Sequence, residues 1–280
     1  MRGQILLLAP VCAVLLGLLV FPVLILVDES FREFTPGFIG ARPHAAYTLE
    51  NYAALLDPAY RFYFIETFWL GLLTSCLALV CAYPIAYRIA RSPIAFERRA
   101  LVMLLVVMIF LGTLVRVYAV LLALGPAGFG SAIVAILDTT LNGIFYTELT
   151  VIAGLLHFTI PIAALALLGS IQSINPRLSD AAQALGANRT ISFVTVTLPL
   201  SAPGLLSAFM LCYTFCISAF VVPMILGKGR VQFASNLIYS RFGEVGNYPG
   251  GSAISVVMLV LSIGLLYLIT RFINRWMTSL

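Results

Sequence analysis

The chain alternates between long apolar runs and shorter polar segments. A transmembrane helix needs about 20 mostly apolar residues, and six runs meet that requirement: residues 4–27, 67–87, 100–124, 149–171, 200–226 and 251–270. The first run follows Arg2 as in a signal peptide, but it is too long for a signal-peptide core and has no small-residue cleavage site before Asp28. We therefore expect residues 1–27 to be retained as the first transmembrane helix. The pattern predicts an all-α, polytopic membrane protein with six transmembrane helices.

The composition agrees with this class. Of the 280 residues, 61% are hydrophobic and 10% are charged, whereas a soluble domain carries about 45–50% apolar and about 25% charged residues. A soluble enzyme and a disordered chain are both excluded by this excess of apolar side chains. The net charge of +5 comes from basic residues scattered singly between apolar runs, which does not form a nucleic-acid-binding face.

The distribution of basic residues predicts the topology. Six helices place both termini on one side, and nine of the 16 Lys and Arg residues fall on the termini and the two connections of that side. The positive-inside rule then places both termini in the cytoplasm of a multi-pass protein of the cell inner (plasma) membrane. Residues 28–66 become a periplasmic loop, residues 67–273 a core of five further helices, and residues 274–280 a cytoplasmic tail.

The outer loops contain short helical segments and most of the acidic residues. Residues 48–57 have the apolar stripe of a short helix that Pro58 is expected to stop, and residues 131–137 are too short to span but apolar enough for the interface. Nine of the 11 acidic residues lie on the outer side; Glu97 and Asp180 are the other two. This excess favours a cationic substrate.

The cytoplasmic connection at residues 172–199 is unusually structured for a membrane loop. Asn175 is a good N-cap, Pro176 occupies the first helical position, and Gly186 stands where a glycine ends a helix. A second helical stretch at residues 188–197 leads into Leu198-Pro199. We expect a helix–Gly–helix hairpin whose small residues, Ala181 and Ala182, allow close approach of a partner.

This connection resembles the EAA loop of binding-protein-dependent ABC import permeases. The family pattern is Glu-Ala-Ala, three residues, Gly, nine residues, Ile-x-Leu-Pro, and both gaps match the chain, with Asp180 for Glu and Val196 for Ile. Other segments are similar to the spermidine/putrescine permease subfamily: residues 48–52 and 55–58, 83–91, 114–119, 154–157 and 236–239. Related permeases carry opines, phosphonates, amino-acid derivatives or iron.

The resemblance implies a type I ABC importer permease fold and a set of partners. These are a cytoplasmic ABC ATPase dimer that binds ATP-Mg, a second permease subunit, identical or homologous, and a periplasmic substrate-binding protein, all acting in a lipid bilayer. It also implies that the hairpin docks into the ATPase. The ATPase-coupling candidates are Asn175, Asp180, Ala181, Ala182, Gly186, Leu198 and Pro199.

The chain itself has no sequence signature of an ATPase or another enzyme. It contains no Gly-x4-Gly-Lys-[Ser/Thr] motif, so we expect no cofactor in this chain and ATP hydrolysis by a partner. An intramembrane enzyme would need a nucleophile with a base, or metal ligands, at membrane depth, and neither Gly-x-Ser-x-Gly nor His-Glu-x-x-His occurs. The alternatives are a secondary transporter or channel, which would leave the docking hairpin unexplained, or a non-transporting scaffold.

Candidates for the substrate path are less strongly indicated, and each has a purely structural alternative. Intramembrane Arg116 marks a substrate path, or it is an interfacial anchor, or it pairs with Glu66, Asp138 or Glu148. The carboxylates of Glu66 and Glu148 form either an acidic vestibule or solvated helix starts. Tyr118 and Tyr213 are either an ammonium-binding cage or packed aromatics, and His157 is either a packing residue or a ligand.

Overall fold

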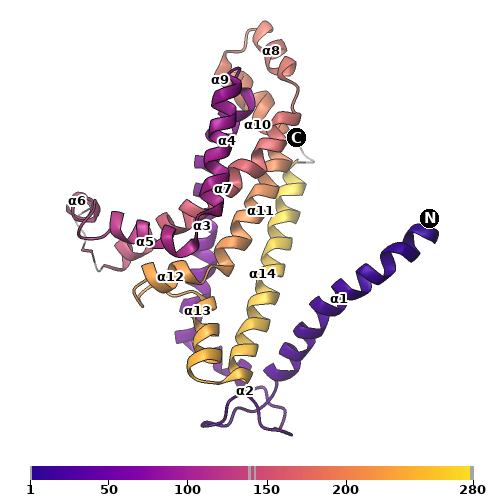
Figure 1. Ribbon diagram of the computed structural model, residues 1–280, viewed down its shortest axis with the longest axis vertical. Helices are drawn as coiled ribbons and strands as arrows, with labels where there is room; N and C mark the ends of the chain where they lie inside the picture. The colour runs from indigo at the N-terminus through magenta and orange to yellow at the C-terminus, as the bar shows by residue number, and fades with distance from the viewer. Residues whose placement is uncertain (1, 138–139, 142, 278–280) are drawn as a thin grey trace. The chain divides into compact units, whose positions relative to one another are not determined.

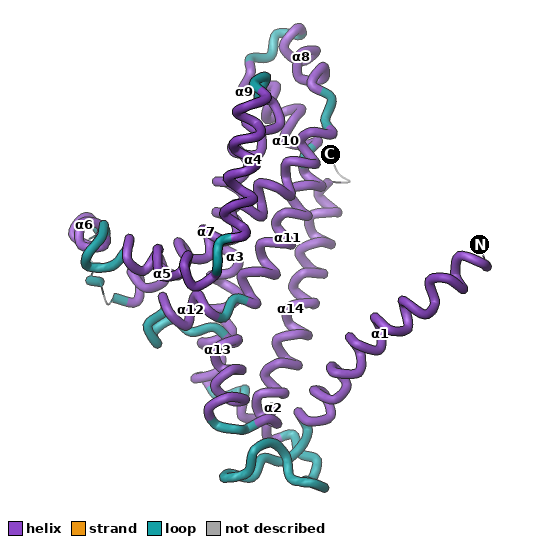
Figure 2. The backbone as a smooth tube through the Cα atoms, in the orientation of Figure 1, coloured by secondary structure: helices purple, strands orange, loops and turns teal. Residues whose placement is uncertain are grey.

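A computed structural model describes residues 2–137, 140–141 and 143–277. Regular structure in this part of the chain is helical, with two isolated β-bridges, Arg32 to Tyr47 and Phe34 to Ala41 (Figure 2). The chain divides into two compact units, residues 1–64 with 234–263 and residues 65–233 with 264–280. Two long helices, α3 (Pro58–Arg91) and α14 (Tyr248–Met277), contribute residues to both units.

The remaining helices belong to one unit each (Figure 1). The first unit contains α1 (Arg2–Ser30), α2 (Glu50–Ala54), α13 (Ala234–Tyr239) and the π-helix η2 (Ser240–Glu244). The second unit contains α4 (Ala95–Phe110), α5 (Thr113–Ala123), α6 (Gly130–Ile136), α7 (Ile144–Ser173), α8 (Pro176–Ala184), α9 (Arg189–Ser192), the π-helix η1 (Phe193–Thr197), α10 (Leu198–Leu200), α11 (Ala202–Ser218) and α12 (Val221–Leu226).

The apolar helices agree with a polytopic membrane protein. Among the described residues, α3, α7 and α14 are each long and apolar enough to cross a membrane, and two bent helix pairs bring the number to five. The first predicted span, residues 4–27, lies within α1. The all-α polytopic class is confirmed; the count of six spans and the cytoplasmic termini stay predictions.

Two predicted spans are not continuous helices. Helix α4 ends where Leu111 adopts an extended conformation, and α5 begins after Gly112 with a bend of 99° between the two helices. The run 200–226 is divided as well, because the chain bends by 66° near Ser201 and α11 ends at an extended Ala219. Hydropathy does not reveal these breaks, because the residues at a turn of the backbone can be as apolar as those in the helices beside it.

Pro58 starts a helix rather than stopping one. The carboxylate of Asp57 accepts a hydrogen bond from the Ala59 amide at 2.9 Å, and proline is well suited to the first helical position because it has no N–H to leave unpaired. The helix α3 therefore runs for 34 residues and begins inside the segment that the sequence predicts as loop. Glu66 consequently lies well inside a helix and not at its start.

The core of the second unit is built from small and aliphatic residues of α3, α4, α7 and α11. Helix α7 packs most extensively against α11 and next against α4. Fully buried alanines at positions 78, 82, 86, 163, 164 and 208 line these contacts. Small side chains let helix backbones approach closely, which is how helices pack in a membrane. Cys212 is buried within the same packing, and Cys216 is buried in a neighbouring cluster with Leu155 and Phe158.

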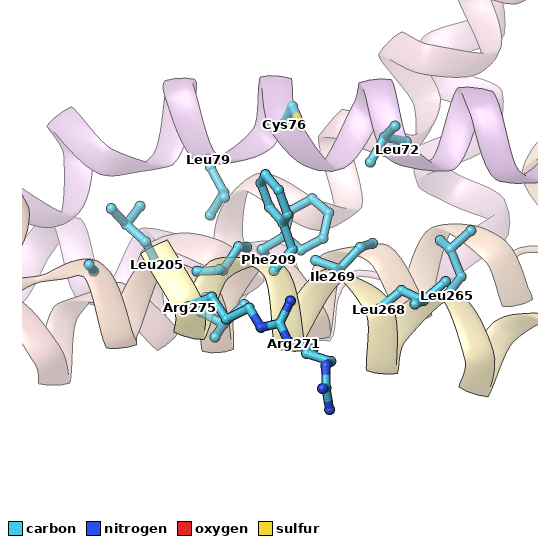
Figure 3. A pocket seen from close by; sticks show the side chains of 14 residues that line it. Leu72, Cys76, Leu79, Leu205, Phe209, Leu265, Leu268, Ile269, Arg271 and Arg275 are labelled. Atoms are coloured by element: carbon cyan, nitrogen blue, oxygen red, sulfur yellow. The ribbon is translucent and has the colours of Figure 1, made fainter. Parts of the chain in front are cut away.

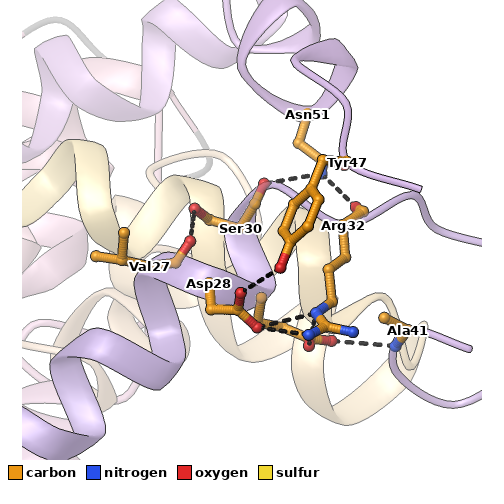
Figure 4. A network of polar contacts seen from close by, with 8 residues as sticks. Val27, Asp28, Ser30, Arg32, Ala41, Tyr47 and Asn51 are labelled. Atoms are coloured by element: carbon orange, nitrogen blue, oxygen red, sulfur yellow. Dashed lines mark hydrogen bonds and ion pairs between the residues drawn. The ribbon is translucent and has the colours of Figure 1, made fainter. Parts of the chain in front are cut away.

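In the first unit, a polar network fixes the end of α1 to the loop that follows it (Figure 4). Asp28 pairs with Arg32 at 2.7 Å and accepts a hydrogen bond from the Tyr47 hydroxyl at 2.9 Å. The bond to this carboxylate raises the pKa of Tyr47 above its usual value. Asn51 donates to the carbonyls of Ser30 and Arg32, both at 2.9 Å. The outer loop is therefore folded onto α1 between residues 28 and 51.

Candidate coupling loop and substrate path

Helix α8 has the start that the sequence predicts. Asn175 adopts an extended conformation and its side-chain oxygen accepts a hydrogen bond from the Arg177 amide at 3.1 Å. Pro176 follows as the first helical residue. An N-cap of this kind satisfies one of the amides that a helix leaves unpaired at its start. The short helix therefore begins at a fixed residue even though it lies outside the membrane-spanning helices.

Gly186 ends α8 in a Schellman motif. Its φ angle is +97°, in the left-handed region that only glycine enters without cost. The Gly186 amide donates to Gln183 O at 3.0 Å and the Ala187 amide donates to Ala182 O at 3.1 Å, the two hydrogen bonds that define this motif. The glycine reverses the chain and lets a second helix begin three residues later, at Arg189.

The second arm of the hairpin is fixed to the first by serine hydroxyls. Asn188 caps α9 by accepting from the Ile191 amide at 2.7 Å. The hydroxyls of Ser179 in α8 and Ser192 in α9 are hydrogen bonded at 2.7 Å, and Ser192 is fully buried. The predicted helix–Gly–helix hairpin is thus present, and its two arms are held together as one rigid piece.

The hairpin presents an exposed face with apolar side chains at its tip. Asp180 and Ala181 are exposed, and Leu185 is 91% exposed. Leu178, Ile191 and Val194 are also exposed. Pro199 is exposed and Leu198 is partly buried. Exposed apolar side chains of this kind make the hairpin a candidate interaction surface.

Residues of α3 connect the hairpin to the membrane helices. The guanidinium of Arg91 donates to Ile174 O at 3.0 Å and to Ile171 O at 3.4 Å, so it satisfies carbonyls at the C-terminal end of α7. The hydroxyls of Tyr83 and Ser201 are hydrogen bonded at 2.8 Å. Hydrogen bonds therefore join α3 to the end of α7 and to Ser201 at the start of α11.

Sequence reasoning did not single out Arg91 and Tyr83 as positioning residues, although both lie in the 83–91 segment that resembles the polyamine permeases. The ring of Phe193 in η1 packs edge-on against Tyr83 at 5.5 Å and Tyr87 at 5.3 Å between ring centres. A cavity of about 1000 Å³ lies between this end of α3 and the hairpin, and Asp180 and Arg189 are among its lining residues. In the sequence, these positioning residues are marked by tyrosines and arginines that lie together near the C-terminal end of a predicted helix.

Two of the substrate-path candidates lie near each other. Glu66 of α3 and Glu148 of α7 are close enough for their carboxylates to repel. The Oε2 atom of Glu66 is buried and has no hydrogen-bond partner among the described residues. A buried carboxylate oxygen without a hydrogen-bond partner is a candidate contact for a cation. Asp138, the third outer acid considered, lies outside the described residues.

The two tyrosines of the expected cage have different surroundings. Tyr213 is fully buried, and its ring stacks on Phe209 with 5.7 Å between centres. Tyr118 is 52% exposed on α5. Tyr213 therefore fits the aromatic-packing alternative. His157 is half-buried with its ring edge-on to Phe158, which places it among packed aromatics too.

Arg116 lies at the break between α4 and α5 and is 5% exposed. Its side chain donates to Leu111 O at 3.0 Å and to Ile109 O at 2.9 Å, carbonyls that the end of α4 leaves without helical partners. Its guanidinium also lies over the Phe158 ring, 4.0 Å from the ring centre. In the part of the chain that the structure describes, two backbone carbonyls and a ring hold this charge, and neither Glu66 nor Glu148 forms an ion pair with it.

Comparison with known proteins identifies the family. Residues 81–279 match the model of the binding-protein-dependent transport system inner membrane component. The chain belongs to this family. The permease is therefore a multi-pass transport component of the inner membrane and not an enzyme, and it is a subunit of an ABC importer.

Individual relatives agree with this assignment. The permease is 29% identical over 236 residues to the spermidine/putrescine transport system permease protein PotB of Salmonella typhimurium (strain SL1344), covering 82% of this chain and 81% of that protein. It is 32% identical to the PotB protein of Haemophilus influenzae, covering 81% of each chain.

A solved structure shows the same fold. A chain of the bacterial alginate ABC transporter in complex with an alginate pentasaccharide-bound periplasmic protein superimposes with a TM-score of 0.78 at 16% identity, covering 99% of the permease and 96% of that chain. The expected ABC importer permease fold is thereby confirmed.

Proposed function

We propose that this permease imports polyamines or a closely related small cationic amine, using ATP hydrolysis by a separate subunit. The transporter would consist of this chain, a second permease, a dimeric cytoplasmic ATPase that binds ATP-Mg, and a periplasmic substrate-binding protein. The sequence similarity to PotB proteins carries the substrate assignment. The alginate transporter, crystallised with a periplasmic protein, supports the binding-protein partner.

The hairpin supports a coupling role because it is rigid and connected at both ends. Helix α8 follows α7 directly through Ile174, and α9, η1 and α10 lead into α11. Closure of the ATPase dimer on ATP would move α8, and α7, α11 and α3 would move with it. For this movement to drive transport, α8 must bind the two ATPase conformations with different affinities, because equal affinity would shift no equilibrium.

The proximity of Glu66 and Glu148 supports a cationic substrate. A polyamine carries several ammonium groups separated by methylenes, so two of them would balance the charges of the two carboxylates. The guanidinium of Arg116 keeps its positive charge, but it is bound to Ile109 O and Leu111 O and so held in a fixed orientation. Glu66 would thus contact the substrate on the outer part of its path.

A secondary transporter or a channel is the competing function. It would need neither the ATPase nor the binding protein, and the lone chain would carry flux without ATP. The capped hairpin and the membership of a binding-protein-dependent family both favour the ATP-driven importer.

The test is uptake by the complete transporter reconstituted in vesicles with its binding protein. We expect ATP-dependent uptake of putrescine or spermidine, and Glu66→Gln should raise the KM for that substrate about tenfold, equivalent to about 1.4 kcal/mol. Glu50→Gln is the matched control, since Glu50 is exposed in α2 on the outer side. ATP-dependent uptake of an opine or amino acid with no polyamine uptake would contradict the substrate assignment.

A further inference from the structure

An apolar groove runs between α3, α11 and α14, entirely within the second unit. Its volume is about 910 Å³, at the upper end of the range for small-molecule sites. Leu72 and Leu79 of α3 and Phe209 of α11 line one side, and Leu265 and Leu268 of α14 line the other (Figure 3). The groove is therefore walled by three different helices and presents carbon atoms along most of its length.

The groove carries positive charge at one end. Arg271 and Arg275, one helical turn apart on α14, are among its lining residues, and none of the described lining residues is acidic. Figure 3 shows both guanidinium groups on the α14 side, extending away from the apolar walls. The Arg271 guanidinium is oriented by a hydrogen bond to the Tyr267 hydroxyl at 3.1 Å. Charge and apolar surface are thus separated along the groove.

The predicted topology places this charge at the inner leaflet. Helices α3 and α14 both run from the outer to the cytoplasmic side, so Leu72 and Leu265 lie deeper in the membrane and Arg275 lies at the cytoplasmic boundary. Arginines at the cytoplasmic ends of membrane helices attract anionic lipid head groups, and basic pockets between such helices bind them specifically. Acyl chains need an apolar channel that continues from the head group into the membrane.

We propose that the groove binds an anionic phospholipid of the inner leaflet. Its phosphate contacts Arg271 and Arg275, and an acyl chain lies along the leucines and Phe209. The pairing of a dibasic rim with an apolar channel favours this occupant, because a single lipid molecule supplies both an anionic group for the rim and an acyl chain for the channel. The lipid would fill the space between α14 and the α3–α11 pair.

Native mass spectrometry of the assembled transporter, released from nanodiscs with equal phosphatidylglycerol and phosphatidylcholine, tests the proposal. We expect phosphatidylglycerol to be retained preferentially, and R271Q/R275Q to reduce that preference about tenfold. The control is R98Q/R99Q, which removes two exposed arginines of α4 that do not line the groove. Leu268→Trp, at a 64% exposed position, should lower lipid retention by filling the channel while both arginines remain.

A photoreactive acyl chain on phosphatidylglycerol gives an independent readout. We expect adducts on peptides that contain Cys76 or Leu268, and fewer adducts in Leu268→Trp. Equal retention of the two lipids, or an unchanged preference in R271Q/R275Q, would overturn the proposal. Cross-links from position 76 to the second permease in place of lipid would overturn it too, by showing that protein covers the groove.

Discussion

Replacing Gly186 by valine is expected to lower ATP-driven uptake at least tenfold while the chain still inserts into the membrane. The φ angle of +97° is strained for any residue with a Cβ and most strained for a β-branched one. No atom lies within 4 Å of the position that a Cβ would occupy, so the substitution acts on the backbone and not through a clash. The Schellman turn would open, and α8 would lose its fixed orientation relative to α9.

Two further variants make this result specific. Gly37→Val introduces the same side chain at a φ of +86° that is equally free of neighbours, and we expect it to leave ATP hydrolysis coupled to uptake. Gly186→Asn should keep most activity, because asparagine tolerates the left-handed region better than other residues. Uptake and ATP hydrolysis are measured together in vesicles. Full coupling in Gly186→Val would remove the hairpin's proposed role.

Replacing Arg116 by methionine is expected to destabilise the protein by about 3 kcal/mol. Methionine preserves the apolar contact with Phe158 but removes the donors to Ile109 O and Leu111 O. A buried carbonyl without a partner costs about 1–3 kcal/mol, and at membrane depth water does not replace the lost bond. The Tm of the detergent-purified protein should fall by roughly 5 °C or more.

The control for Arg116 is Arg98→Met, the same change at an exposed position of α4, which should shift the Tm little. Arg116→Lys should fall between the two, because one ammonium cannot reproduce the fork of a guanidinium. Measuring Tm and uptake together also distinguishes a structural role of Arg116 from a role in the substrate path. An unchanged Tm with a lost uptake activity would assign Arg116 to the substrate path and contradict its structural role.

The hairpin could be predicted from the sequence because local residues determine it. Asn175, Pro176 and Gly186 act on the backbone within a few positions of themselves, and their hydrogen bonds are those expected from their types. The apolar runs were equally informative about fold class, since hydropathy and helix length are properties of the chain itself. The sequence therefore predicts a structural feature best when the residues that determine it lie within about one helical turn of it.

The breaks in the apolar runs and the contacts across helices could not be predicted in the same way. The turn at Leu111 and Gly112 lies within an apolar run and so does not appear in the hydropathy of the sequence. Arg116, which donates hydrogen bonds to carbonyls at this turn, is the charged residue that interrupts the run. The bond from Arg91 to Ile174 joins residues 83 positions apart. The sequence places Glu66 at a helix start because the charge-free run begins at Thr67, whereas α3 begins at Pro58.

Photo-cross-linking from position 185 in the assembled transporter tests the coupling role most directly. Leu185 is the exposed apolar tip of the hairpin, and a benzophenone amino acid there should form an adduct with the ATPase whose yield changes when ATP is trapped. Ile39, 74% exposed in the outer loop, is the control and should form no ATPase adduct. An ATPase adduct from position 39 and none from position 185 would contradict the account.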